Sequence, residues 1–202
     1  MNKAFQTGRG MDGDTRSKAY YYRGMARIGL LKKGSNSPEI GPDPYLNVYN
    51  DLENAILLDN QWKEPAQAEM SLIYQELLKS ARSTYNLGRD TNEETEVRRL
   101  FGSSILKLTT AAKINDNFQV NSLLGKAFYD LGFFYDQLAD DDASAENKAV
   151  SSYESAKEYF EKAFRMNGNS LDVIRGLKDI AYRFGDREKE LEYARLEENI
   201  GG

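Results

Sequence analysis

Apolar residues recur every three or four positions along most of the chain, which is the spacing of one face of an α-helix. The clearest run extends from Val97 to Ala112, and a second one extends from Tyr153 to Phe164. Alternation of apolar and polar residues, which would indicate a strand, occurs only in short stretches. No proline follows Pro65, and the remaining sequence is rich in residues that favour helices. The pattern therefore predicts an all-α protein.

Three segments share one pattern, in which a large apolar residue is followed after three positions by alanine and then by a polar stop. They are "LENAILLDN" (52–60), "LTTAAKIND" (108–116) and "FEKAFRMNG" (160–168). Each segment follows a separate expected helix, and these helices span 17–33, 66–87 and 118–138. A shorter pair of helices is expected at 171–184 and 187–198. The sequence thus predicts about four pairs of antiparallel helices.

The helix pairs resemble the tetratricopeptide repeat (TPR), whose units are helical hairpins of about 34 residues. The third pair carries the resemblance most fully, because "LLGKAFYDLG" has Gly125 at a small-residue position of the family. Its second helix supplies Ala156, Phe160 and Ala163 at further small and large positions. In the first pair, Gly24 takes the small position of the first helix.

The resemblance covers about residues 16–198 and implies an α-solenoid of irregular, bacterial-type repeats, in which TPR-like hairpins pack side by side. On this interpretation one domain spans residues 16–202, and residues 1–15 form a flexible N-terminal tail. Insertions are expected between the helices of two hairpins, at 34–44 and 140–148.

Cysteine and histidine are both missing from the sequence, which excludes disulfides, thiol-based zinc sites and Ser-His or Cys-His dyads.

Three short motifs resemble functional sites but lack the context that such sites need. "GRGMDG" (8–13) has the glycine spacing of a nucleotide-binding loop, but the strand that precedes such a loop is missing. "SILK" (104–107) lies inside a helix, where Ser104 is expected to be a packing residue. "DDDASAE" (140–146) lacks the glycine and the final glutamate of a calcium-binding loop, so we expect a solvated loop. We therefore expect a non-enzymatic protein with no metal and no cofactor.

The charged residues sum to a net charge of −5. Nucleic-acid binding needs a concentrated basic surface, whereas lysine and arginine are scattered here, so we expect no nucleic-acid partner. No apolar run approaches the length of a membrane span. Residues 1–17 are polar and glycine-rich, unlike a signal peptide. A cytoplasmic protein is the expectation, and a periplasmic or secreted one is the alternative if a signal peptide has been removed.

Proteins of the repeat family bind an extended peptide or a helix of a partner in a concave groove, which is lined by the first helix of each hairpin. The resemblance therefore implies a protein–protein interaction module. By their positions in the repeat, the groove residues are Tyr21, Met25, Ile28, Leu78, Arg82, Tyr85, Ser122, Lys126, Tyr129, Arg175, Asp179 and Tyr182. The alternative is that some of them pack only against a neighbouring hairpin. One branch of the family holds a chaperone's C-terminal carboxylate with Lys and Asn where this chain has Tyr21 and Met25, which argues against that ligand.

The run "DLGFFYDQL" lengthens the first helix of the third pair, which is expected to continue to about Leu138. Consecutive rings on a helix cannot share one face. Phe134 shares a face with Leu138, while Tyr129 and Phe133 form a separate stripe that leads out of the groove. We predict that Tyr129 and Phe133 form an aromatic ledge for a peptide. The alternative is that an insertion at 139–149 covers the rings.

A second hypothesis for the function is a self-assembling structural protein that homodimerises through its end helices. The last helix, "REKELEYARLEE", is strongly charged, as the cap of a solenoid would be. The N-terminal helix is more apolar, with Tyr20, Tyr21, Tyr22 and Met25. A self-association surface is therefore expected at the N-terminal end.

Overall fold

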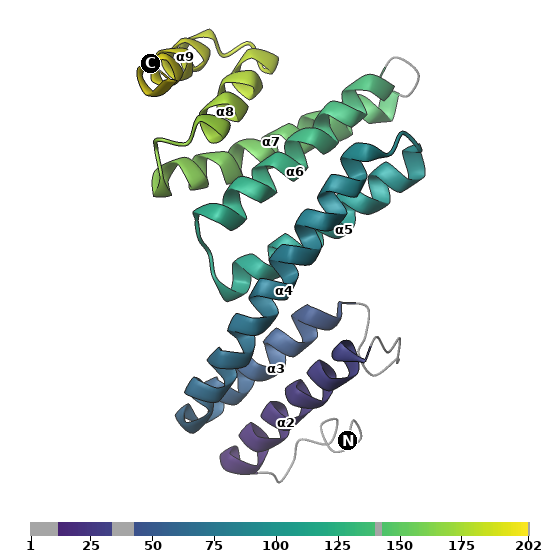
Figure 1. Ribbon diagram of the computed structural model, residues 1–202, viewed down its shortest axis with the longest axis vertical. Coiled ribbons are helices and arrows are strands. Elements are labelled where there is room, and N and C mark those ends of the chain that lie inside the picture. The colour runs from purple at the N-terminus through teal and green to yellow at the C-terminus, as the bar shows by residue number, and fades with distance from the viewer. Residues whose placement is uncertain (1–11, 34–42, 140–142, 202) are drawn as a thin grey trace. The chain divides into compact units, whose positions relative to one another are not determined.

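The computed structural model describes residues 12–33, 43–139 and 143–201 (Figure 1). These residues form eight α-helices and one short 3-10 helix, and no strand occurs among them. The elements are α2 (Gly13–Lys32), α3 (Pro44–Leu58), η1 (Asn60–Trp62), α4 (Lys63–Asp90), α5 (Glu94–Ile114), α6 (Phe118–Leu138), α7 (Ala143–Met166), α8 (Leu171–Arg183) and α9 (Arg187–Gly201). The prediction of an all-α protein is confirmed.

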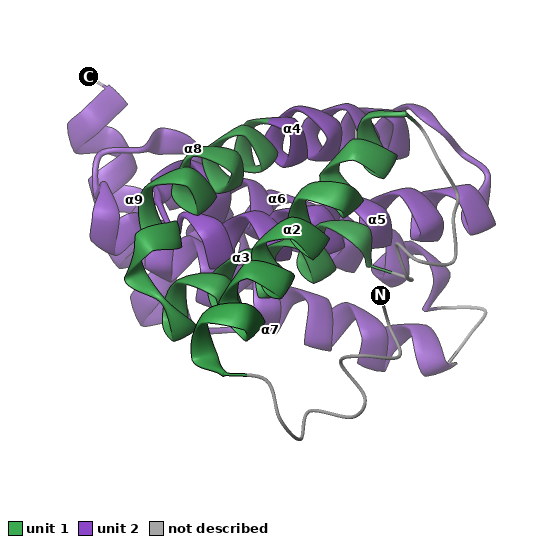
Figure 2. Ribbon diagram, turned by 90° about the horizontal axis from the view of Figure 1, so that it is seen from below, with its two compact units in different colours: residues 1–75 green, residues 76–202 purple. Residues whose placement is uncertain are grey.

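The chain divides into two compact units, residues 1–75 (unit 1) and residues 76–202 (unit 2), and the boundary falls within α4 (Figure 2). Unit 1 contains α2, α3, η1 and the first part of α4, and unit 2 contains the rest of α4 and α5 to α9. Most of the predicted N-terminal tail, residues 1–15, lies outside the described residues, and α2 already begins at Gly13. The single domain over 16–202 stays a prediction.

Side-chain caps define where the first two helices begin. Asp12 accepts a hydrogen bond from the backbone N–H of Thr15 at 2.7 Å, so α2 starts earlier than predicted. Asp43 accepts one from the backbone N–H of Leu46 at 3.1 Å. Pro44 occupies the first turn of α3, where its missing N–H is not needed. The second helix of the first pair therefore begins at Pro44, ahead of the 52–60 segment that carries the repeat pattern.

Within unit 1, α2 and α3 pack closely because Gly24 has no side chain. A Cβ at Gly24 would lie 3.1 Å from Leu52 Cδ2, closer than ordinary van der Waals contact. A charged group is buried beside this seam. Asp51 accepts hydrogen bonds from Arg23 Nε at 3.0 Å and from Arg27 Nη1 at 2.5 Å. The Asp51 side chain is only 2% exposed, so its charge depends on these two guanidinium groups.

Two of the consecutive tyrosines of α2 pack against Trp62 of η1. Tyr21 stacks on Trp62, with ring centroids 4.4 Å apart and ring planes 21° apart. Tyr22 meets the same indole edge-on at 6.0 Å and is otherwise exposed. The indole N–H donates to Ser17 Oγ at 3.1 Å, which ties η1 to α2. Tyr21, a predicted groove residue, is thus partly covered by Trp62 within unit 1.

The core of unit 2 is organised around Phe160 of α7, whose ring fits between two glycines. A Cβ at Gly125 of α6 would lie 2.4 Å from Phe160 Cδ1, and a Cβ at Gly176 of α8 would lie 2.5 Å from Phe160 Cε2. Ala156 and Ala163, on either side of Phe160 in α7, are fully buried. The three helices approach one another here because glycine and alanine leave room for one large ring.

The part of α4 in unit 2 packs on α5 through small residues. Ser104 is buried, and its Oγ donates to the backbone carbonyl of Ala81 at 2.9 Å. A Cβ at Gly88 would lie 3.3 Å from Leu100 Cβ, so glycine allows the end of α4 to approach α5. The expectation that Ser104 is a packing residue is confirmed.

The α6–α7 hairpin is longer than the sequence indicated. α6 ends at Leu138 as predicted, but α7 begins at Ala143. The expectation of a solvated loop over 140–146 is therefore wrong from Ala143 onward, and residues 140–142 lie outside the described residues.

Two alanines explain why this acidic segment is helical. Ala145 and Ala149 lie one helical turn apart, and both are buried. The proposed insertion at 139–149 is thus mostly the first turns of α7. Phe133, one of the rings that this segment covers on the alternative hypothesis, is 54% exposed.

Candidate functional site

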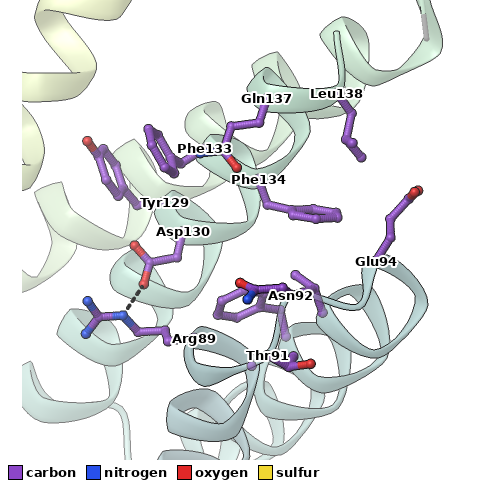
Figure 3. A pocket seen from close by; sticks show the side chains of 13 residues that line it. Arg89, Thr91, Asn92, Glu94, Tyr129, Asp130, Phe133, Phe134, Gln137 and Leu138 are labelled. Carbon is purple, nitrogen blue, oxygen red and sulfur yellow. Dashed lines mark ion pairs between the residues drawn. The ribbon is translucent and has the colours of Figure 1, made fainter. Parts of the chain in front are cut away.

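A cleft of about 830 Å³ opens in unit 2 between the α4–α5 turn and the C-terminal half of α6 (Figure 3). From the end of α4, the turn and α5 it is lined by Arg89, Asn92, Glu94, Val97 and Phe101, among others. From α6 it is lined by Tyr129, Asp130, Phe133, Phe134, Gln137 and Leu138. Apolar side chains from two elements therefore share the cleft with polar groups, which is the usual composition of a binding site.

The helical repeat of α6 arranges its side chains in two stripes. Phe134 lies one turn after Asp130, and its ring points toward the start of α5, where Glu94 lies (Figure 3). Tyr129 and Phe133 form the neighbouring stripe of the helix, and they line the same cleft (Figure 3). The two stripes follow from helical spacing, and the role of Tyr129 and Phe133 as a ledge for a peptide stays a prediction.

Asp130 is the most enclosed charged group of the cleft, with 27% of its side chain exposed. The Tyr85 hydroxyl donates to Asp130 Oδ2 at 2.6 Å, and Arg89 Nε lies 3.5 Å from the same oxygen. Burial raises the pKa of Asp130, although the Tyr85 hydrogen bond and the Arg89 charge oppose this shift. Burial, followed by the hydrogen bond to Asp130, raises the pKa of Tyr85, so this phenol stays protonated as a donor.

Tyr129 is held between α7 and α8. Its ring meets Tyr153 edge-on at 5.5 Å, and its hydroxyl lies 3.5 Å from Asp179 Oδ2. Burial raises the pKa of Tyr129, and the carboxylates of Asp179, Asp130 and Asp136 raise it further. The surroundings of this ring are therefore negatively charged.

Three of the predicted groove residues come together at this site. Tyr129 and Phe133 line the cleft, and Tyr85 reaches it through Asp130. The sequence reasoning missed Asp130 itself. Its four-residue spacing from Phe134 was a signal that could have identified it, because the two side chains must then share a face.

Other predicted groove residues are not part of the cleft. Ile28 and Leu78 are core residues, so neither side chain offers a surface to a partner. Met25 and Ser122 are half-buried, and Arg82 is exposed.

The remaining predicted positions are mostly engaged in ion pairs. Lys126 Nζ lies 2.6 Å from Asp172 Oδ2, and Arg175 Nε lies 2.7 Å from Glu197 Oε1. Tyr182 is largely exposed at the end of α8. These ion pairs join α6 to α8 and α8 to α9, a structural role that the sequence pattern did not indicate.

Within the part of the chain that the structure describes, no three acidic side chains gather as a metal site would require. Among the same residues, no helix is both long enough and apolar enough to cross a bilayer. No family model matches the chain, and no curated protein matches it significantly.

Proposed function

We propose that this chain is a non-enzymatic protein–protein interaction module, which binds a peptide or a helix of a partner protein at the cleft beside α6. The observation that carries the proposal is the exposure of Phe133 at the edge of the cleft, next to Tyr129. A large ring that is half exposed at the edge of a cleft gains buried apolar area when a partner covers it.

We also propose that the helix pairs are TPR-like repeats of an α-solenoid. The close approach of α6 and α7 at Gly125 supports this, because the family places a small residue at that position. Gly24, at the corresponding position of the first pair, supports it in the same way.

The test is selection of binding peptides from a random heptamer library displayed on phage, followed by anisotropy titrations with the labelled peptides. We expect Phe133→Ala to weaken binding about tenfold, because truncated aromatic anchors typically cost this much or more. Its melting temperature should stay that of the parent, since the ring is exposed.

Leu106→Ala is the matched control for this variant. Leu106 is 50% exposed, close to the value for Phe133, but it does not line the cleft. Peptide affinity should change less than about twofold in this variant. Selected peptides that bind both variants as tightly as the parent would contradict a site at the cleft.

Homodimerisation through an end helix is the competing proposal, and the exposure of Tyr22 on α2 favours it. Sedimentation velocity over a range of protein concentrations separates the two. The interaction module is expected to sediment as a monomer of 22.9 kDa. A dimer that dissociates in the Tyr22→Arg variant would support self-assembly instead.

A further inference from the structure

The carboxylate of Asp130 has acceptor capacity to spare. Both of its contacts, with Tyr85 and with Arg89, are made through Oδ2. The other oxygen, Oδ1, has no hydrogen-bond partner among the described residues. A carboxylate offers about four lone-pair sites, and a partly desolvated one gains most from a cationic donor.

Arg89 shows which kind of group this site accepts. Its guanidinium lies 5.9 Å from the centre of the Tyr85 ring and beside Asp130 (Figure 3). However, the 3.5 Å separation is longer than the 2.7–2.9 Å of a good charge-assisted hydrogen bond, and the Arg89 side chain is 62% exposed. An exposed pair of this kind is weak, so a cation from another molecule can displace Arg89 or bind beside it.

The charges around the cleft favour a cation over an anion. Asp130 and Asp179 place negative charge near Tyr129, whereas the charge of Asp136 is balanced by Arg183. The basic groups nearby are already engaged, since Lys126 pairs with Asp172 and Arg183 binds Asp136 through two nitrogens. Glu94, on the opposite side of the cleft, pairs with Arg98.

We infer that the cleft recognises an arginine side chain of the bound peptide, with Asp130 as its counter-ion and Tyr129 and Phe133 as aromatic walls. This rests on the proposed function and adds the chemistry of the peptide. Arginine fits better than lysine, because its planar guanidinium can stack on a ring and bind a carboxylate at the same time. An apolar residue next to that arginine would pack on Phe134 and Leu138.

The experiment uses the fluorescein-labelled heptapeptides selected on the parent chain, together with copies in which citrulline replaces arginine. Citrulline keeps the shape of the side chain and removes its charge. We expect the selected sequences to be enriched in arginine and the citrulline copies to bind at least about tenfold more weakly.

Two variants of the protein should change affinity in opposite directions. Asp130→Asn keeps an acceptor for the Tyr85 hydroxyl and should weaken binding about tenfold. Arg89→Ala removes the competing cation and should tighten binding roughly two- to fivefold. Glu192→Gln, an exposed carboxylate of α9, is the control and should leave affinity unchanged.

The outcomes separate this inference from the proposed function. If Phe133→Ala abolishes binding but Asp130→Asn and citrulline do not, the proposed peptide site is supported and the inferred recognition of arginine is wrong. If Arg89→Ala weakens binding while Asp130→Asn does not, the cleft binds an acidic group instead. If neither ring nor carboxylate matters, both proposals fail. Should Asp130→Asn not fold, the citrulline copies on the parent chain still decide the question.

Discussion

Gly125→Leu is expected to lower the free energy of unfolding of unit 2 by about 3 kcal/mol or more, because it forces a side chain into the ring of Phe160. The first atom of any side chain at this position would lie 2.4 Å from Phe160 Cδ1. The ring cannot move toward α8 either, because its other edge already lies against the backbone of Gly176. A Cβ at Gly176 would be only 2.5 Å from Phe160 Cε2. Phe160 is 2% exposed, so it cannot turn out to solvent either.

Alanine at the same position gives the sharper comparison. In an exposed helix interior, replacing glycine with alanine stabilises by about 0.5–1 kcal/mol. Gly102→Ala should show this gain, because nothing lies within 4 Å of its added Cβ. Gly125→Ala should instead destabilise. Urea unfolding followed by far-ultraviolet circular dichroism measures both, and a gain at Gly125 equal to that at Gly102 would contradict this packing.

A second substitution tests whether Phe160 is the cause. Phe160→Leu shortens the ring side chain and should by itself destabilise through a cavity. Combined with Gly125→Ala, it should cost less than the sum of the two single changes, with a coupling of at least about 1 kcal/mol. Additive effects would mean that the clash lies elsewhere.

The sequence predicted most of the helices because apolar spacing is a local signal, but it misplaced some of their ends. The end of α6 at Leu138 followed from apolar spacing, and the small-residue position of Gly125 followed from the resemblance of this hairpin to the repeat family. The start of α7 was missed because three aspartates precede it and suggest solvent, whereas the buried faces of Ala145 and Ala149 depend on α6 being beside them.

Only part of the candidate site could be predicted from the sequence. Tyr129 and Phe133 could be placed together because they lie on one helix. The contact of Arg89 with Asp130 could not be predicted, because it depends on how the end of α4 lies against α6 in space. Ile28 was assigned to the groove from its repeat position, but burial is decided by the whole surrounding structure.

In unit 1 we expect replacement of Asp51 to be strongly destabilising, because Asp51 carries a buried charge that two arginines balance. Two arginines of α2 reach this one carboxylate of α3, and their side chains are only 21% and 17% exposed. Removing the carboxylate leaves two guanidinium groups close together with little water to solvate them. Breaking a buried ion pair from one side typically costs more than the pair contributes when intact.

We therefore expect Asp51→Ala to lower the free energy of unfolding of unit 1 by about 2–3 kcal/mol. Trp62 is the only tryptophan of the chain and stacks on Tyr21 within unit 1, so its fluorescence during urea unfolding reports this unit. Lys18→Ala, which breaks an exposed pair on α2, should shift the transition very little. Combining Asp51→Leu with Arg23→Met and Arg27→Met should restore most of the lost stability, because no charge is then left buried. A triple variant as unstable as Asp51→Ala would show that hydrogen bonds, and not unpaired charge, account for the loss.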